Sequence, residues 1–340
     1  MTAHRDITVL LPVYNAEQFI AESVTSILQQ TYRYFTLLII DDGSTDRTGT
    51  ILEELAAQDL RIELYRRENR GLVATLNEGL ALCRTELIVR MDADDIAMPE
   101  RLAIQKAYMD AHPEIAVCGS SIIIHEYDKV YDFPEKTAFD VQSLFHSPLA
   151  HPSVIFRKSI IMRVGGYDIN MPAAEDYDLW VRLLSAGFHI ANIPAPLLRY
   201  RIHPYDARIR YRITAEQTTN KIWQCQLSKL GIKMNLKDID IHRYCSYPCQ
   251  DTRSHQKKAI KWLEKICAAN KSFKVYNQKE LEEFCNSIRN SFPPPVDWKK
   301  NPRKWIFRQG CHVGFAFFCL FGPWGVMFFQ KIKKVIRNYK

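Results

Sequence analysis

Three carboxylates occupy four consecutive positions in this chain, at Asp92, Asp94 and Asp95, close behind an apolar run. Like charges this close repel one another unless a positive group lies among them. Oxygen ligands suit Mg²⁺ or Mn²⁺, which often bind one or two carboxylates together with substrate phosphates. The spacing therefore predicts a divalent-cation site that a diphosphate completes. The alternative is that these residues only end a strand and cap the helix at Pro99.

Other nucleotide and metal motifs are missing from the sequence. It has no GxGxxG after a strand, no GxxxxGK[ST] and no HExxH, so the dinucleotide-binding, P-loop and zincin classes are excluded. Counted from Asp92, the sixth position lacks the glycine that an EF-hand needs. A zinc site at His242, Cys245, Cys249 and His255 would have irregular spacing, which favours ordinary buried thiols.

The elements that must position the carboxylates alternate between strands and helices over the first 125 residues. Short runs rich in β-branched residues predict strands at 7–13, 36–42, 61–67, 86–91 and 115–124. Helical periodicity and caps predict helices at 17–30, after Ser44 or Thr45, at 72–82 and from Pro99. This alternation predicts a doubly wound, mostly parallel sheet, which binds ligands at the carboxyl ends of its strands.

Polar residues follow four of these predicted strands. They are Pro12 to Asn15, Asp41 to Ser44, Arg66 to Gly71 and Asp92 to Asp95. Because the carboxyl ends of parallel strands meet at one edge of a sheet, we expect these segments to lie together.

Four stretches in about the first 100 residues resemble the nucleotide-sugar domain of family 2 glycosyltransferases in their order and spacing. They are VLLPVYNAEQFIAESVTSILQQTY, LLIIDDGSTDRT, NRGLVATLNEGL and RMDADDIAMPERL. The resemblance implies an α/β fold of the glycosyltransferase A type, with a Rossmann-like, mostly parallel sheet flanked by helices. It also implies donor-binding roles for Pro12, Tyr14, Asn15, Asp42, Asn69, Gly71, Asp92 and Asp94. Among these, Asp92 would contact the ribose and Asp94 the metal.

The resemblance continues into HPSVIFRKSIIMRVGGYD, AAEDYDLWVRLLSAG and LLRYRIHP. It implies that Asp176 is the catalytic base, that Glu175, His151 and Asp95 support the site or the acceptor, and that Arg201 and His203 close over the diphosphate. His203 would join Asp94 as a metal ligand. Without the resemblance, Glu175 and Asp176 are an ordinary acidic helix start, and Arg201 and His203 a solvated basic strand.

Charge divides the chain into an acidic and a basic part. Residues 1–220 carry 22 Lys and Arg against 30 Asp and Glu, whereas residues 221–340 carry 24 against 8. We expect a catalytic domain at 1–215, a helical basic extension at 216–298 and a basic, aromatic tail at 299–340. The uncharged run 310–329 is interrupted by Gly-Pro-Trp-Gly and flanked by basic residues, so we expect it to dip into or lie on a membrane; a packing element is the alternative.

The sequence thus predicts a metal-dependent, inverting glycosyltransferase that uses a nucleotide-diphosphate sugar, with UDP favoured. We expect a lipid-linked glycan or lipopolysaccharide precursor as acceptor, at the cytoplasmic face of the inner membrane. Cysteines at irregular spacing favour free thiols over disulfides. The alternative is a non-catalytic, membrane-bound scaffold that binds sugar nucleotides. Nucleic acid is not expected as a partner, because the basic blocks are separated by aromatic, uncharged residues that suit lipid.

Overall fold

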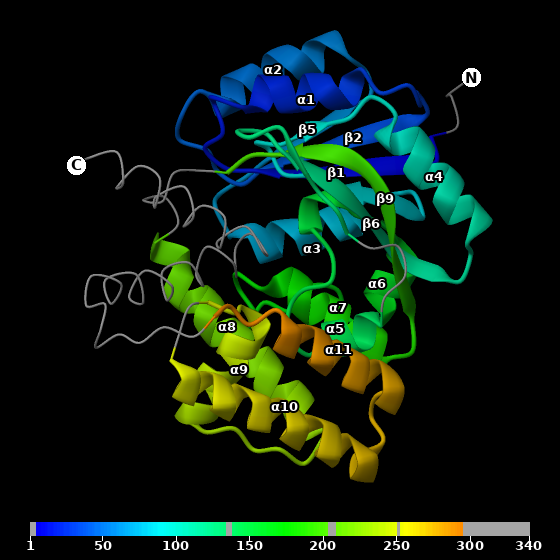
Figure 1. Ribbon diagram of the computed structural model, residues 1–340. Coiled ribbons are helices and arrows are strands. Elements are labelled where there is room, and N and C mark those ends of the chain that lie inside the picture. The colour runs from blue at the N-terminus through cyan, green and yellow to red at the C-terminus, as the bar shows by residue number, and fades with distance from the viewer. Residues whose placement is uncertain (1–4, 134–137, 203–208, 250–251, 295–340) are drawn as a thin grey trace. The chain divides into compact units, whose positions relative to one another are not determined.

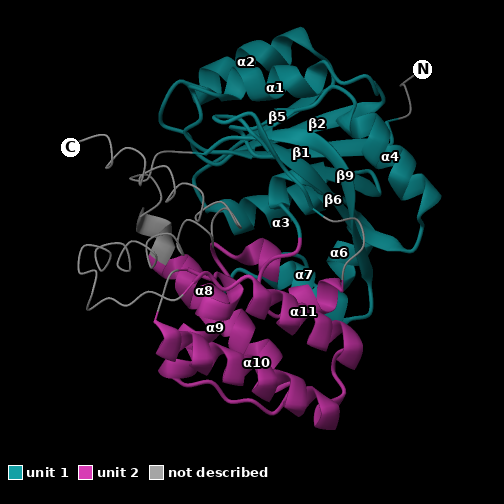
Figure 2. Ribbon diagram, in the orientation of Figure 1, with its two compact units in different colours: residues 1–137, 149–170, 178–204 teal, residues 138–148, 171–177, 205–340 magenta. Residues whose placement is uncertain are grey.

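The chain forms two compact units (Figure 2). The computed structural model describes residues 5–133, 138–202, 209–249 and 252–294 (Figure 1). Unit 1 comprises residues 1–137, 149–170 and 178–204, and unit 2 comprises 138–148, 171–177 and 205–340. The predicted membrane-associating tail and His203 lie outside the described residues.

Unit 1 is built on a nine-stranded sheet of order β3-β2-β1-β4-β8-β6-β9-β5, in which β7 also pairs with β6. The strands are β1 Ile7–Val13, β2 Phe35–Asp41, β3 Ile62–Arg66, β4 Leu87–Arg90, β5 Ile96–Ala97, β6 Ile115–Ile124, β7 Lys129–Tyr131, β8 Ile155–Arg157 and β9 His189–Tyr200. Strands β1 to β4 are parallel to one another, and β6 and β9 form a second parallel pair. The predicted mostly parallel sheet is therefore confirmed.

Helices cover both faces of this sheet. They are α1 Ile20–Leu28, α2 Thr48–Gln58, α3 Leu72–Leu82, α4 Arg101–Ala111, the 3-10 helix η1 His151–Ser153, and α6 Lys158–Arg163. Helices α1 and α2 lie on one face and α3 on the other (Figure 1). Gly79 lets α3 approach β1 closely, since a Cβ there would come within 2.3 Å of a methyl carbon of Leu10. The second half of α3 therefore packs directly on β1.

The predicted strand at 7–13 coincides with β1 and that at 115–124 with β6, and the helix at 72–82 coincides with α3. Three helix starts were predicted too early. Helix α1 begins at Ile20 rather than at Glu17. Helix α2 begins at Thr48 rather than beside Ser44 or Thr45, because both of those residues hydrogen-bond Asn15 instead. Helix α4 begins at Arg101, two residues after Pro99.

Four strands, β5, β7, β8 and β9, have no counterpart in the sequence-based prediction. Three of them are only two or three residues long. Strand β9 is twelve residues long but contains Pro194 and Pro196, which argue against a strand within a sheet. The structure accommodates them through irregularities in the β6–β9 register around Ser121.

Unit 2 is helical. Its helices are α5 Phe139–Gln142, α8 Ile209–Ser228, α9 Leu236–Ser246, α10 Arg253–Phe273 and α11 Gln278–Asn290, together with the first residues of α7 Glu175–Ser185. His242 lies at its centre, where Nδ1 accepts a hydrogen bond from Trp262 at 3.0 Å and Nε2 donates to the Leu144 carbonyl at 3.0 Å. Both ring nitrogens are thus used within the core. No helix among the described residues has the length and apolar character needed to cross a bilayer.

Candidate active site

The loops that follow β1 and β2 are tied to each other at the carboxyl edge of the sheet. Asn15 has a left-handed backbone, with φ of 50°, and its side-chain oxygen accepts a hydrogen bond from the backbone N–H of Thr45 at 2.8 Å. Its own N–H donates to the Ser44 hydroxyl at 2.9 Å. Pro12 is buried within β1, whereas the Tyr14 side chain is exposed. Tyr14 is therefore available for a ligand, while Asn15 shapes the loop.

Asp42 organises the loop that follows β3. Its buried carboxylate accepts hydrogen bonds from the backbone N–H groups of Arg70 at 2.8 Å and Gly71 at 2.9 Å, and from the guanidinium of Arg67. Gly71 has a φ of 85° and precedes the first residue of α3, while Asn69 is exposed. The carboxylate at the end of β2 thus holds the 67–71 loop and the start of α3 in place.

A glycine allows these two loops to meet. A Cβ on Gly43 would lie 2.6 Å from the backbone nitrogen of Asn69, and Gly43 has a φ of 76°. Both conditions exclude a larger side chain without rearrangement. Three predicted donor-binding segments, at 12–15, 42–44 and 69–71, are therefore brought together.

Asp92, Asp94 and Asp95 form a cluster in the turn after β4. Each offers a carboxylate oxygen, and these oxygens lie within 4.8 Å of one another. The Asp95 side chain is fully buried; its Oδ1 accepts a hydrogen bond from the backbone N–H of Arg201 at 2.9 Å. Its Oδ2 has no hydrogen-bond partner in the described part of the chain. Burial, and then the charges of Asp94 and Asp92, raise the pKa of Asp95 well above its usual range.

The cluster fits a hard divalent cation. Its donors are all carboxylate oxygens, the ligand type that Mg²⁺ and Mn²⁺ prefer. The buried, unpartnered Oδ2 of Asp95 is a second indication, because such an oxygen is costly without a hydrogen bond or a cation. Among the described residues, this is the one group of three or more acidic, His or Cys side chains close enough to share an ion.

Two buried arginines lie beneath the cluster. Arg90, at the end of β4, forms a bidentate ion pair with Asp92, with both N···O distances at 2.6 Å. Arg101, at the start of α4, donates from one nitrogen to the carbonyls of Arg90 and Pro152, each at 2.8 Å. The side chain of Arg90 is 3% exposed and Arg101 is fully buried. Burial lowers the pKa of Arg101 to about 9, with Asp95 acting in the opposite direction.

Arg201 follows β9 and lies beside the cluster, but its side chain already has partners. Its guanidinium forms an ion pair with Glu22 and lies 5.1 Å from the centre of the Phe19 ring. Nη1 lies 3.4 Å from the ring nitrogen of His125. Because Glu22 is exposed, this ion pair can exchange with a phosphate at little cost.

His151 lies in η1, buried against two aromatic side chains. Its Nε2 lies 2.9 Å from the Tyr167 hydroxyl, and its ring meets Trp180 edge-on at 6.1 Å. Burial, and then the charge of Arg90, lower the pKa of His151 well below its usual value. The imidazole is therefore neutral near pH 7, and its contacts with Tyr167 and Trp180 hold η1 in place.

Glu175 and Asp176 begin α7 and belong to unit 2. Glu175 is buried and Asp176 is half-buried. The next residue, Tyr177, is fixed by a hydrogen bond of 2.6 Å from its hydroxyl to the Ser143 carbonyl. The helix start therefore has a defined position within unit 2.

Sequence reasoning missed Arg90, Arg101 and Glu22, and it placed Arg67 at the carboxyl edge within the segment 66–71 without giving it a role. Arg90 ends an apolar strand and Arg101 begins a helix, and each reads as a surface residue in sequence. One signal in the sequence could have identified Arg90. Three carboxylates this close in the chain need a positive charge nearby, and Arg90 is the basic residue nearest to them in sequence.

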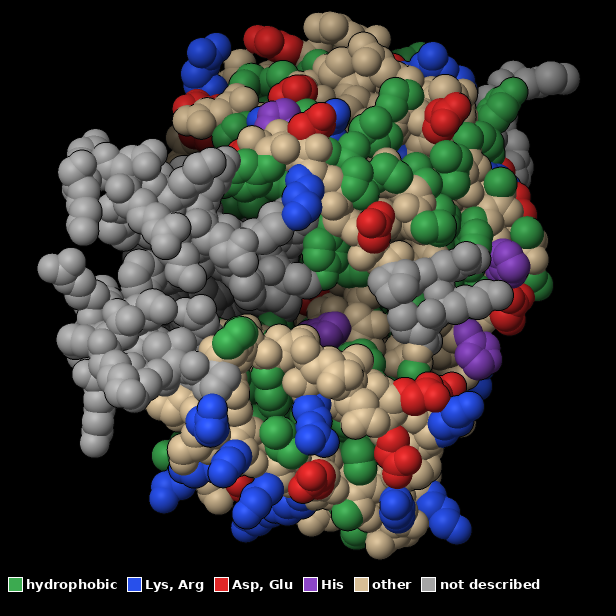
Figure 3. Space-filling view, in the orientation of Figure 1, with side chains coloured by type: hydrophobic (Ala, Val, Ile, Leu, Met, Phe, Trp, Pro, Cys, Tyr) green, Lys and Arg blue, Asp and Glu red, His purple; other side chains and the backbone are tan. Residues whose placement is uncertain are grey.

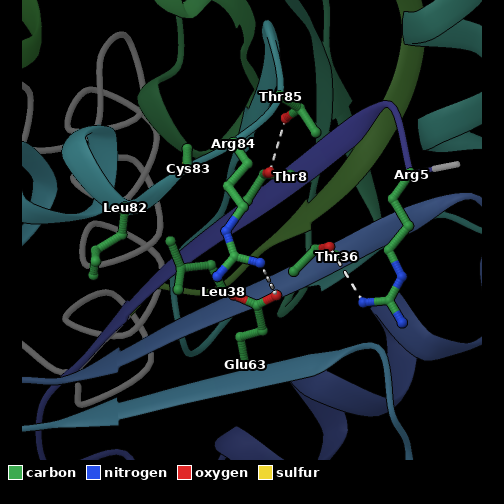
Figure 4. Close-up of a pocket in the computed structure, with 9 residues that line it drawn as sticks. All are labelled: Arg5, Thr8, Thr36, Leu38, Glu63, Leu82, Cys83, Arg84 and Thr85. Atoms are coloured by element: carbon green, nitrogen blue, oxygen red, sulfur yellow. Dashed lines mark hydrogen bonds and ion pairs between the residues drawn. The ribbon is translucent and has the colours of Figure 1, made fainter. Parts of the chain in front are cut away.

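A separate pocket of about 370 Å³ lies near the amino ends of β1 to β3 and contains none of the predicted site residues. Figure 4 shows Arg84 reaching Glu63 and Thr8 hydrogen-bonded to Thr85 among the residues that line it. It lies at the edge of the sheet opposite the acidic cluster. We therefore assign the chemistry to the carboxyl edge.

Comparison with known proteins agrees with the geometry. Residues 8–164 match the family model described as glycosyl transferase family 2. An uncharacterised glycosyltransferase of Haemophilus influenzae is 32% identical over 253 residues, covering 68% of this chain and 77% of the relative. The O-antigen biosynthesis glycosyltransferase WbnJ of Escherichia coli is 32% identical over 204 residues, covering 58% and 80%.

Two further proteins have more specific names. The UDP-Gal:alpha-D-GlcNAc-diphosphoundecaprenol beta-1,3-galactosyltransferase of Escherichia coli is 31% identical over 215 residues, covering 60% of this chain and 76% of the relative. The mannosyltransferase PcManGT of Pyrobaculum calidifontis, solved with GDP-Man and Mn²⁺, shares the fold with a TM-score of 0.57 and 18% identity. That alignment covers 94% of this chain and 88% of the mannosyltransferase.

Proposed function

The chain belongs to glycosyltransferase family 2, and from this membership we propose that it transfers a sugar from a nucleotide-diphosphate sugar to a hydroxyl group during polysaccharide assembly. The observation that carries the proposal is the aspartate cluster at the carboxyl edge of the sheet, braced by Arg90 and lying within the family match. A scaffold that only binds sugar nucleotides has no need of a catalytic base, so Asp176 distinguishes the two functions.

The strand-end residues bind the donor. Tyr14 borders the base, and the loop held by Asp42 forms the wall beside it. Asp92, oriented by Arg90, would accept a hydrogen bond from the ribose, and Asp94 and Asp95 would hold Mg²⁺ or Mn²⁺. The metal supplies positive charge for the departing nucleoside diphosphate. The mannosyltransferase solved with GDP-Man and Mn²⁺ supports this cofactor.

Asp176 acts as the general base, with Glu175 beside it. An acceptor hydroxyl does not ionise near neutral pH, so its proton has to leave as the new bond forms; base catalysis contributes about 10²- to 10⁴-fold. A single displacement of this kind inverts the configuration of the sugar carbon. Arg201 would exchange Glu22 for the diphosphate when the donor binds, and His203 would be a further metal ligand by the family resemblance.

The acceptor is a lipid-linked glycan and the donor a UDP-sugar. The name of the galactosyltransferase relative, which acts on a diphosphoundecaprenol-linked sugar with UDP-Gal, supports both assignments. A lipid-linked acceptor places the enzyme at the cytoplasmic face of the inner membrane as a peripheral or monotopic protein. The basic, aromatic tail at 299–340 provides one contact.

An activity assay of the purified protein tests the proposal. The assay contains Mn²⁺, a polyprenyl-diphosphate-linked sugar as acceptor, and a panel of UDP- and GDP-sugars as donors. We expect metal-dependent release of nucleoside diphosphate with formation of an extended glycolipid. Asp176→Asn should lose turnover while binding donor as the wild type does. Asp178→Asn, two positions along α7 and ion-paired with Arg182 at 2.7 Å, is the matched control and should retain turnover.

Full transfer by Asp176→Asn would contradict the base assignment. Donor binding without transfer or donor hydrolysis by the wild type, across the whole panel, would favour the scaffold instead.

A further inference from the structure

The solvent-facing side of α10 in unit 2 is basic over its whole length. Its exposed basic residues are Arg253, Lys257, Lys258, Lys261, Lys265 and Lys271, against the single exposed acid Glu264. Figure 3 shows Lys and Arg side chains gathered over this part of unit 2. No ion pair joins Lys257, Lys258 or Lys261 to another described residue. We call this surface, with the tip described below, the basic face.

Two of these lysines have stabilising partners, since Lys265 lies 5.0 Å from the centre of the Trp262 ring and Lys271 forms an ion pair with Glu282 at 3.5 Å. The stability of α10 does not account for Lys257, Lys258 and Lys261. Lys257, Lys261 and Lys265 follow one another at intervals of four, so like charges are neighbours on the helix and repel each other. Arg253 also lies in the first turn, where the helix dipole disfavours cations. A negatively charged partner outside the helix would remove both costs.

The basic face ends in a tip with exposed apolar side chains. Leu236 is 85% exposed, Phe273 is 55% exposed and Val275 is 39% exposed. Lysines at 237 and 274 adjoin them in sequence. Exposed apolar residues set among lysines are typical of a surface that lies at a lipid interface.

Contacts within unit 2 bring the parts of the tip to one end. Helices α9 and α10 run antiparallel, since the side chain of His242 meets Trp262 at 3.0 Å and that of Cys245 meets the Ala259 carbonyl at 3.8 Å. The start of α9 therefore lies level with the last turns of α10. The loop before α9 reaches the same end, because a Cβ on Gly231 would contact the Phe273 ring.

The turn after Phe273 is held rigidly. Asn270 is buried, and its side chain both donates to the Tyr276 carbonyl and accepts from the Tyr276 N–H, each at 2.9 Å. The apolar tip is therefore preformed and needs little ordering to bind.

We propose that the basic face of unit 2 binds an anionic lipid surface, with the lysines of α10 on the head groups and Leu236 and Phe273 at the interface. The segment 299–340 of the same chain carries ten basic residues and no acid, so repulsion opposes its covering this face. The choice of lipid over other polyanions rests on the proposed function, in which the acceptor is lipid-linked. Polar contacts to phosphate and sugar account for most protein–DNA hydrogen bonds, and the exposed apolar side chains Leu236 and Val275 of the tip cannot make them.

Vesicle co-sedimentation of the full chain tests the proposal. The vesicles contain either phosphatidylcholine alone or phosphatidylcholine with phosphatidylglycerol, and a short duplex DNA serves as the competing polyanion. We expect binding to the anionic vesicles only. Lys257→Gln/Lys258→Gln/Lys261→Gln should weaken it by about 10- to 100-fold, since each lysine near an anionic leaflet contributes up to about fivefold.

Controls separate this surface from general charge and from folding. The matched variant Arg33→Gln/Arg84→Gln/Lys129→Gln removes the same charge from exposed positions of unit 1 and should keep vesicle binding. The α10 variant should unfold at the same temperature as the wild type or higher, because it removes repulsion within the helix. Phe273→Ser should weaken vesicle binding without changing the dependence of that binding on salt concentration, because it removes an apolar contact and no charge.

Equal vesicle binding by the α10 variant and the wild type would overturn the proposal, as would a preference for DNA over anionic vesicles. Salt-sensitive self-association of the chain without vesicle binding would overturn it too. Vesicle binding needs no turnover, and transfer to a water-soluble acceptor analogue needs no vesicle. Sugar transfer without vesicle binding would therefore contradict only the proposed lipid-binding surface, whereas vesicle binding without sugar transfer would contradict only the proposed function.

Discussion

Both terminal nitrogens of Arg90 lie 2.6 Å from the carboxylate oxygens of Asp92, one nitrogen to each oxygen. The Arg90 side chain is almost fully buried, whereas the Asp92 side chain is 31% exposed. Asp92 is therefore the member of the pair that a ligand can reach. Two parallel hydrogen bonds fix the plane of the carboxylate as well as its charge. Arg90 thereby orients Asp92 and offsets part of the repulsion within the acidic cluster.

Replacing Arg90 should leave the repulsion among the carboxylates of the acidic cluster without compensation. We expect Arg90→Met to lower the free energy of unfolding by about 3 kcal/mol, because it leaves a partly buried carboxylate without its partner. Saturating Mn²⁺ should restore more stability to this variant than to the wild type, since the cation replaces the lost charge. Thermal unfolding with and without Mn²⁺ measures both effects. Equal stabilisation of the two proteins by Mn²⁺ would show that Arg90 does not act as a counter-ion to the cluster.

Asp95→Asn should have the opposite effect on the protein without metal. The raised pKa of Asp95 means that the folded state holds its proton more tightly than the unfolded chain does. The wild type therefore gains stability as the pH falls from the folded pKa toward the unfolded value near 3.9. Asparagine removes this slope and should raise the free energy of unfolding at pH 7.5.

The same substitution should reduce stabilisation by Mn²⁺, because it removes one ligand. Urea unfolding at pH 5 and pH 7.5, with and without Mn²⁺, separates the two consequences. Asp110→Asn, an exposed carboxyl on α4 outside the cluster, is the control. If Mn²⁺ raises the free energy of unfolding of Asp95→Asn as much as that of the wild type, Asp95 is not a metal ligand.

Asp42→Asn should loosen the loop after β3. An amide keeps one acceptor oxygen, whereas the carboxylate accepts from the backbone of both Arg70 and Gly71 and from Arg67. We expect faster amide hydrogen exchange across residues 67–75 and a donor KM about tenfold higher, with exchange in β6 unchanged. Wild-type exchange in the loop would show that Asp42 does not hold it.

The pH dependence of unit 2 should follow His242. Burial lowers the pKa of His242 to about 4, so the unfolded chain takes up a proton at a higher pH than the folded state does. Stability should therefore fall as the pH drops from about 6.5 to about 4, by roughly 3 kcal/mol over that window.

Trp223 and Trp262 contact the His242 ring, so tryptophan fluorescence in urea reports on this part of the core. His242→Gln should be less stable at pH 7.5 but should show a shallower dependence on pH. A slope equal to that of the wild type would assign the effect to other groups.

The parts of the fold that were predicted from the sequence depend on local pattern. Strands β1 and β6 and helix α3 combine strong periodicity with clear ends, and their predicted bounds coincide with those observed. The acidic cluster was found because its three members are adjacent in the chain. What escaped prediction is non-local: Arg101 reaches the Pro152 carbonyl across 51 positions, and Arg201 reaches Asp95 across 106.

Calorimetric titration of the protein with UDP, in the presence and absence of Mn²⁺, tests the central claim most directly. We predict that Mn²⁺ strengthens UDP binding at least tenfold and that Asp94→Ala abolishes this gain, while the charge-matched variant Asp110→Asn retains it. Equal UDP affinity with and without Mn²⁺, or a full Mn²⁺ effect in Asp94→Ala, would contradict the assignment of the aspartate cluster as the diphosphate-metal site.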